Sequence, residues 1–268
     1  MCKSAHLVPP VREDIVDASI KVSLMTQAQA GDFDCRVYER IVAAVQAEQS
    51  GIDLSVTPNA KVIGCISGVQ RQIDVLIDAR WGDDDVETRT IVDAKCYRAK
   101  LDVKDVESFE GMMRDCRAQR GILVCPNGSS EAAKRRAQDA ITITLLSPDD
   151  LDDFPWAQFD PCMGECARSR RGKNGLVLWD GQLPVGLEGT WVIVWSGKCD
   201  RCHNFHIWCW DCGEKFALSD EDEHICYCGY RWVTVIEQEL SNDELLNAVH
   251  LILMIGQQIF PLDRRRLR

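Results

Sequence analysis

The sequence predicts an α/β fold, a mixed sheet flanked by helices, followed by a small cysteine-rich β domain that binds zinc. Two observations predict it. Helix-like periodic segments alternate with short β-branched runs in the first half, which is typical of a sheet covered by helices. Eight of the 14 cysteines crowd into residues 162–228, where most of the tryptophans also lie, so the second half is a different kind of structure.

The elements of the first half follow from their hydrophobic periods. Phe33, Val37 and Ile41 share one face of a helix that starts near Asp32 and ends before Gly51. The other expected elements are strands over 61–67, 71–79, 89–97, 121–125 and 141–146, and helices over 12–20, 103–117 and 129–139. The polar loop RWGDDDVE joins the second and third strands, so we expect an antiparallel hairpin there.

A polar, proline-flanked segment, SPDDLDDFP, indicates a domain boundary near residue 150. The expected divisions are an N-terminal extension (1–32), the α/β domain (33–150), a zinc-binding β module (151–240) and a C-terminal helix with a basic tail (241–268). Within the module we expect strands over 175–181 and 190–197. Segment 242–257 is apolar nearly all round, which predicts a buried helix, and the terminal RRRLR predicts a solvated tail.

Composition excludes several classes of protein. Hydrophobic residues make up 46% and charged residues 27%, as in a soluble globular protein and unlike a disordered chain. No apolar stretch is long enough to cross a bilayer, so we expect no membrane partner. The start lacks the apolar core of a secretory signal, and the many cysteines then indicate a reducing, cytoplasmic location. The net charge of −11 excludes a globally basic nucleic-acid coat, so DNA contacts must come from local basic clusters.

Two carboxylates and one ammonium group lie on neighbouring expected strands. Because side chains alternate along a strand, Asp93 and Lys95 share a face and Ala94 points away. Asp74 joins them if it pairs opposite residue 93 or 95, and lies on the other face if the register is shifted by one. The sequence leaves these two registers open, because the ends of the connecting loop are not defined.

This group of side chains has a chemical use if the first register holds. Two close carboxylates repel each other, and Mg²⁺ (or Mn²⁺) relieves the repulsion while it activates water and polarises a phosphoryl oxygen. Lys95 would orient or deprotonate the attacking water. The carbonyl of Ala94 is a candidate third ligand, and Glu39 is a candidate outer or second-metal carboxylate.

Three segments, RQIDVLI, IVDAKCYRAKLDVKDVESFEGMMRD and RGILVCPNGSSEAAKRRAQDAITI, resemble the Mrr-like restriction endonuclease domains of the PD-(D/E)XK nuclease superfamily. The resemblance covers residues 33–146 and implies a restriction-endonuclease-like sheet. Asp74 matches the first acidic position, Asp93-Ala94-Lys95 matches the metal-binding tripeptide, and Glu39 is a looser match to a glutamate of the first helix. Two features depart from the family: Asp93 stands where glutamate is common, and PNGSS replaces a phenylalanine-containing turn.

The resemblance implies a metal-dependent DNA endonuclease, a prokaryotic restriction or antiviral defence effector. Double-stranded DNA is the expected partner, a homo-oligomer is expected because a double-strand break needs two sites, and an activating protein or ligand is possible. Candidate phosphate contacts are Arg98, Lys100, Lys104, Arg168, Arg170 and Arg171. The alternatives are a catalytically inert nuclease fold that binds nucleic acid or protein, and a nuclease acting in repair or on RNA.

The second half carries cysteine spacings typical of zinc ribbons. The preferred quartet is Cys209, Cys212, Cys226 and Cys228, from CWDCG and CYCG. A second zinc would use Cys162, Cys166, Cys199 and Cys202, with His203, His206 or His224 as alternative ligands and an interleaved pairing left open. Sites made of four cysteines have no open position for substrate, which indicates a structural zinc.

Overall fold

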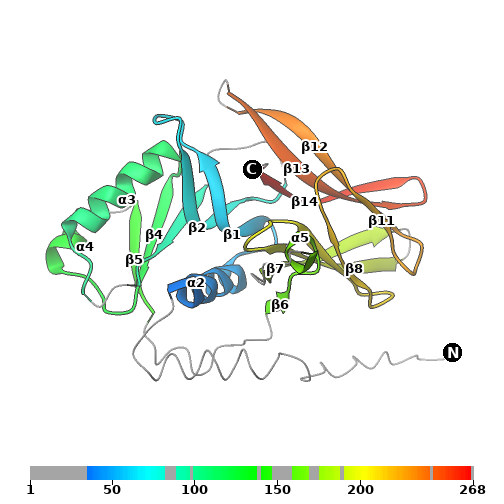
Figure 1. The fold of residues 1–268 in the computed structure, drawn as a ribbon, viewed down its shortest axis with the longest axis horizontal. Coiled ribbons are helices and arrows are strands. Elements are labelled where there is room, and N and C mark those ends of the chain that lie inside the picture. Colours follow the sequence, from blue (N-terminus) through cyan, green and yellow to red (C-terminus); the bar gives the residue numbers. More distant parts are fainter. Residues whose placement is uncertain are drawn as a thin grey trace.

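The computed structural model describes residues 35–81, 89–96, 99–137, 140–146, 159–168, 175–187, 190–241 and 244–266. Figure 1 shows two halves side by side, a sheet with helices and an assembly made almost entirely of strands. In the described part of the chain, no helix has the length and apolar character needed to cross a membrane. The expected helix over 12–20 lies outside the described residues.

The first half is built on a five-stranded sheet, which confirms the expected mixed sheet. Its strands, in spatial order, are β1 (Leu54–Ile63), β2 (Gln70–Ala79), β3 (Thr90–Ala94), β4 (Arg120–Cys125) and β5 (Ile141–Leu145). Strands β1 to β3 run antiparallel, whereas β3 to β5 are parallel. The crossovers that parallel strands require are α3 (Val103–Asp115) and α4 (Glu131–Ala137).

Helices cover both faces of this sheet. The first, α2 (Cys35–Gln49), buries Ile41 and Val42 in one core cluster with Val92 of β3. On the other face, Phe109 of α3 belongs to a second cluster with Ile91. A capping box at Asp102 starts α3, as the side chain of Asp102 accepts hydrogen bonds from two backbone N–H groups of the first turn.

The second half holds two further antiparallel sheets. One has the order β10-β9-β8-β7-β6, made of β6 (Phe159–Pro161), β7 (Leu176–Leu187), β8 (Thr190–Cys199), β9 (Phe205–Cys209) and β10 (Lys215–Leu218). The other has the order β11-β12-β13-β14, made of β11 (Glu223–Ile225), β12 (Arg231–Ser241), β13 (Glu244–Ile255) and β14 (Gln258–Arg266). A short helix, α5 (Glu165–Arg168), follows β6. The two sheets share one core around Trp232 and Phe205, which are fully buried.

The expected C-terminal helix over 242–257 is wrong, because this segment forms β13 and turns into β14. Val249, Leu251 and Leu253 alternate into the core, as in a strand with one buried face. Gly256 adopts a φ of 60°, which closes the hairpin to β14 and which side chains disfavour. An apolar run of this length does not distinguish helix from strand by its period, so pairing with β12 on one side and β14 on the other decides it.

Two smaller expectations also need correction. The basic end is not a solvated tail: Arg264 and Arg265 are only 9% and 5% exposed and belong to β14. The strand expected over 61–67 instead begins at Leu54 and ends at Ile63. Pro58 argues against a strand in the first part of this segment, because proline has no N–H to donate. However, β1 is an edge strand, where such a residue is tolerated.

The two halves are joined by a buried network of four charged side chains. Arg80 lies 3.2 Å from Asp180 and 2.9 Å from Asp263, and Lys198 lies 3.1 Å and 2.7 Å from the same carboxylates. All four side chains are 0% exposed. Each cation therefore has two carboxylates, which satisfies charges that would be costly to bury alone. The second half is consequently fixed to the β1–β2 edge of the first sheet.

Candidate metal centres

The carboxylate site begins with the register of β2 and β3. Val75 pairs with Val92 and Ile77 with Thr90, so Asp74 lies opposite Asp93. This is the register that places Asp74, Asp93 and Lys95 on one face. Oδ2 of Asp74 accepts a hydrogen bond of 2.8 Å from the backbone N–H of Ala94, which ties the two strands together at the site.

The electrostatics of this site show crowded negative charge. Burial raises the pKa of Asp74 to about 7, although the Ala94 N–H acts against this, and the carboxylates of Asp93 and Glu39 raise it further. Glu39 reaches the site from α2, where the guanidinium of Arg36 lies 2.9 Å from its carboxylate. A carboxylate that resists ionisation beside two others is a donor set that a divalent cation fits, because the cation offsets the repulsion.

Lys95 completes the group from the end of β3. Its Nζ lies 2.7 Å from Oδ2 of Asp93, and the two side chains are 22% and 15% exposed. Both groups therefore remain accessible to solvent while they are paired. Among the described residues, three or more ligand atoms within 4.8 Å of one another occur only in the two cysteine quartets, so Glu39 does not join Asp74 and Asp93 as a third close ligand. Two carboxylates remain a possible donor set for Mg²⁺, which keeps several waters and takes one or two carboxylates.

The candidate phosphate contacts divide between the two halves. Lys100, which precedes α3, and Lys104, in its first turn, are exposed in the first half. Arg168 is exposed in α5, which Figure 1 shows in the second half, so the structure does not gather it with the two lysines. Arg98, Arg170 and Arg171 lie outside the described residues.

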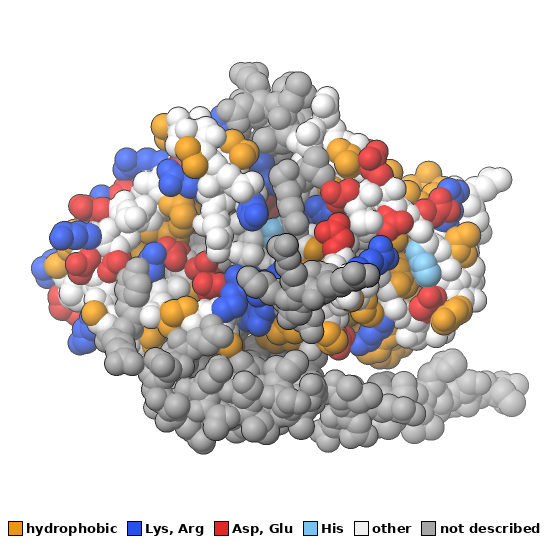
Figure 2. Space-filling view, viewed as in Figure 1, with side chains coloured by type: hydrophobic (Ala, Val, Ile, Leu, Met, Phe, Trp, Pro, Cys, Tyr) orange, Lys and Arg blue, Asp and Glu red, His pale blue; other side chains and the backbone are white. Residues whose placement is uncertain are grey.

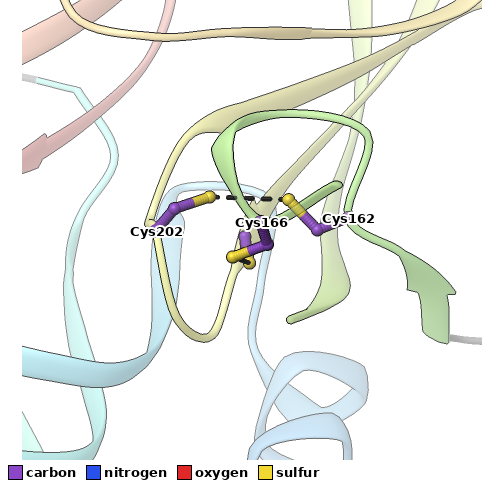
Figure 3. A group of neighbouring side chains, drawn as sticks. Cys162, Cys166 and Cys202 are labelled. Atoms are coloured by element: carbon purple, nitrogen blue, oxygen red, sulfur yellow. Dashed lines mark hydrogen bonds between the residues drawn. The ribbon is translucent and has the colours of Figure 1, made fainter. Parts of the chain in front are cut away.

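The first cysteine quartet combines Cys162, Cys166, Cys199 and Cys202, as expected from the sequence. Sγ of Cys162 lies 3.5 Å from that of Cys202, and Sγ of Cys166 lies 3.8 Å from that of Cys199. Figure 3 shows the thiols of Cys162, Cys166 and Cys202 turned toward a common centre. Hydrogen bonds from Cys162 and Cys199 lower the pKa of Cys202, so the cluster stabilises a thiolate, the form that binds metal.

The second quartet combines Cys209, Cys212, Cys226 and Cys228, again as expected. Sγ of Cys228 lies 3.6 Å from that of Cys209 and 3.1 Å from that of Cys226. Gly213 and Gly229 follow the two knuckles with positive φ angles of 73° and 84°. These glycines allow the tight turns that aim both thiols of a knuckle at one point.

The histidines considered as alternative ligands have other partners. The backbone N–H of Met163 donates to Nε2 of His206 at 3.1 Å, and Nδ1 of the same ring lies 3.0 Å from the carbonyl of Asn204. Nε2 of His224 lies 2.9 Å from Glu214. Both quartets are therefore made of cysteines alone, without interleaving.

Asp200, between Cys199 and Cys202, is a connecting residue that the sequence reasoning missed. Its carboxylate is 3% exposed and lies 2.9 Å from both Arg36 and Arg40 of α2. It also accepts a 2.8 Å hydrogen bond from the backbone N–H of Leu176. The sequence did contain a signal for this contact. Asp200 is an acidic residue inside a cysteine knuckle, and Arg36 and Arg40 are four residues apart on a helix.

Comparisons with known proteins find a nuclease family for part of the chain. Residues 32–154 match the Mrr_cat family model, described as a restriction endonuclease. No curated protein matches the chain significantly. A solved protein of unknown function, AF1548, is 18% identical with a TM-score of 0.36, over 48% of this chain and 69% of that one. The MspJI restriction endonuclease, solved with a 27-mer oligonucleotide, is 18% identical with a TM-score of 0.31, over 54% of this chain and 33% of that one.

Proposed function

Because residues 32–154 match the restriction endonuclease family model Mrr_cat, we propose that this protein is a metal-dependent endonuclease that hydrolyses phosphodiester bonds of DNA. The observation that carries the proposal is the meeting of Asp74 and Asp93 on paired strands, with Lys95 on the same face. These are the groups that the chemistry requires, and the matched family segment contains all of them.

The roles follow from the position of each group. Asp74 and Asp93 would hold Mg²⁺ or Mn²⁺, with the carbonyl of Ala94 as a third ligand and Glu39 as an outer carboxylate. The metal supplies a more acidic bound water and a polarised phosphoryl oxygen. Lys95, which is paired with Asp93 in this structure, would orient the attacking water and offset charge on the phosphate.

The two cysteine quartets would each hold a structural Zn²⁺. Four thiolates around one tetrahedral ion leave no position for substrate, so these ions would contribute to folding and not to hydrolysis. The first quartet, through Asp200, would also hold α2 and therefore Glu39 in place.

The substrate, location and assembly of the protein are part of the same proposal. Double-stranded DNA would be the substrate, bound with help from exposed Lys100 and Lys104 of the first half. We infer a cytoplasmic protein that assembles with further copies to cut both strands, and that serves restriction or antiviral defence in a prokaryote. An activating protein or ligand would then restrict cleavage to the conditions in which that partner is bound.

The experiment that tests the proposal is plasmid cleavage with Mg²⁺, with Mn²⁺ and with EDTA. Asp93→Asn and Lys95→Met are expected to lower the rate at least a hundredfold, while the thermal midpoint and bound zinc stay as in the wild type. Lys215→Met, which removes an exposed ion pair with Asp160 in the second half, is the matched control. Equal cleavage by Lys95→Met and the wild type would refute the assignment.

A second candidate function has one observation in its favour. The 2.7 Å ion pair between Lys95 and Asp93 is the arrangement that an inert fold would keep as a permanent structural contact. Such a protein would bind DNA without cutting it. Mg²⁺ titration of the wild type and of Lys95→Met distinguishes the endonuclease from the inert fold. If Mg²⁺ competes with Lys95 for Asp93, the affinity for Mg²⁺ differs between the two proteins, whereas an inert fold binds no Mg²⁺ at this site.

A further inference from the structure

One residue of β1 connects the carboxylate site to the first cysteine quartet. The register of β1 against β2 places Asn59 opposite Asp74. Nδ2 of Asn59 donates a hydrogen bond of 2.7 Å to the backbone carbonyl of Asp200, which lies in the knuckle between Cys199 and Cys202. This bond joins residues that are 141 positions apart in the sequence. The knuckle of the second half therefore contacts the strand pair that carries the first carboxylate.

The conformation of Asn59 is unusual for the interior of a strand. Its φ is 51°, in the left-handed region that most side chains disfavour and that asparagine adopts more often than other residues. The buried Oδ1 of its amide has no hydrogen-bond partner in the described part of the chain. A strained backbone and an unsatisfied buried oxygen both cost stability, and such costs gather at functional sites. Both occur at the residue opposite Asp74, which indicates a requirement other than stability.

The same knuckle also holds the helix that carries the outer carboxylate. Nη2 of Arg36 donates to the carbonyl of Asp200 at 3.0 Å and to its carboxylate at 2.9 Å, while Nη1 donates to Glu39 at 2.9 Å. Figure 2 shows basic and acidic side chains next to one another at the position that α2 has in Figure 1. Asp200 thus contacts both of the elements that carry Asp74 and Glu39. A displacement of the knuckle would therefore reach both carboxylates.

We propose that Asn59 is a positioning residue, through which the knuckle between Cys199 and Cys202 sets the position of Asp74 for metal binding. The inference rests on the proposed function only in taking Asp74 and Asp93 as the metal-binding pair. The first quartet then has a role beside folding, because ordering its knuckle also orders the carboxylate site. Asn59 carries no net charge, so its replacement changes the geometry around the metal and leaves the charge of the site unaltered.

The test is titration of the full chain with Mn²⁺, followed by electron paramagnetic resonance, in the wild type and in Asn59→Gly. Glycine accepts a positive φ and lacks the amide, so this variant keeps the backbone and loses the bond to Asp200. We expect the affinity for Mn²⁺ to fall at least fivefold, with a thermal midpoint close to that of Glu221→Gly. This control introduces glycine at an exposed residue with a φ of 52° and should bind Mn²⁺ as the wild type does. Asp93→Asn identifies the binding that occurs at the carboxylate site.

A second measurement follows the position of Asp74 without metal. Oδ2 of Asp74 accepts the backbone N–H of Ala94, so hydrogen exchange at this N–H reports whether the carboxylate stays in place. We expect faster exchange in Asn59→Gly and unchanged exchange in Glu221→Gly. Equal Mn²⁺ affinity or equal exchange in Asn59→Gly and the wild type would overturn the proposal. Absence of an Asp93-dependent Mn²⁺ site in the wild type would instead contradict the proposed function, and the exchange measurement then decides alone whether Asn59 positions Asp74.

A double-mutant cycle tests the connection to the quartet. Cys166→Ser removes the least buried thiol of the first quartet and should also weaken Mn²⁺ binding. If both changes act through the knuckle, Asn59→Gly and Cys166→Ser together weaken binding no more than the stronger of the two does alone. Additive effects would show that the quartet and Asn59 act independently, which contradicts the role of the knuckle. Cys228→Ser, in the second quartet, should leave the Mn²⁺ affinity unchanged.

Discussion

The two cysteine quartets have the same chemistry but different surroundings. In the first, Cys162, Cys199 and Cys202 are buried, and the intervening Asp200 bonds to two arginines of α2 in the other half of the molecule. In the second, Cys228 is exposed, and its neighbours bond within their own half, as Tyr230 does to Asp211. The first quartet therefore connects the two halves, whereas the second joins only two hairpins of the second half.

The largest expected effect on stability comes from removing one thiol of a quartet, and the two quartets can be compared in this way. Cys199→Ser should destabilise the protein by about 4 kcal/mol or more, the range associated with loss of a structural metal site. It should also speed hydrogen exchange in α2, because Asp200 no longer has a fixed position. Cys228→Ser should speed exchange in β9 to β12 and leave α2 protected. Equal exchange of α2 in both variants, measured by mass spectrometry, would end the distinction between the quartets.

The next effect concerns the buried network that also connects the halves. Arg80→Met leaves Asp180 and Asp263 with Lys198 as the one cation of the described network, and unpairing buried charge costs about 3–5 kcal/mol. Urea unfolding should show this loss as a lower midpoint. Arg231→Met, which removes an exposed pair with Glu223, should leave the midpoint almost unchanged. If the two variants unfold alike, the network is not a main connection.

A third prediction isolates the carboxylate between the first pair of thiols. Asp200→Asn keeps the size of the side chain but removes the negative charge that faces Arg36 and Arg40. Charge-assisted hydrogen bonds of this kind contribute about 2–3 kcal/mol, so the urea midpoint should fall. The comparison variant Asp211→Asn, one position later in the other knuckle, changes an exposed contact with Tyr230 and should have little effect. A fall of equal size in both would show that Asp200 has no special connection.

The smallest expected effect lies at the carboxylate site, which the first quartet reaches through α2. Because the folded state raises the pKa of Asp74 from 3.8 to about 7, it holds this proton more tightly than the unfolded chain does. Without divalent metal, Asp74 therefore destabilises the folded state increasingly as pH rises toward 7. Between pH 5.5 and 8, Asp74→Asn should gain about 2 kcal/mol relative to the wild type. A gain that is independent of pH would contradict the raised pKa.

Patterns within short segments were enough to predict most helices and strands of the first half. The helix now called α2 and the strands β2 to β5 follow from side-chain periods within single segments, and the structure places them close to the expected residues. The register of β2 against β3 was not predictable, because it depends on the loop between them, and a shift of one residue would have turned Asp74 away from Asp93.

The C-terminal hairpin and the buried charges show where local reasoning fails. The apolar segment 244–255 has no period that excludes a helix, and its fate depends on β12 and β14, which pair with it. Lys198 and Asp180 are charged residues inside otherwise apolar strands, and the sequence alone does not predict that they pair with each other. The partners come from strands far apart in the chain.

By itself, then, the sequence determined which residues could act: the acidic and basic groups of two strands, and eight cysteines in knuckles of short spacing. These depend on contacts between near neighbours, which a local pattern records. Only the tertiary structure decided which groups meet, that the last segment is a hairpin, and that Asp200 and Arg80 connect the halves. Those outcomes depend on strand pairing and on burial of charge, which are set by segments distant in the chain.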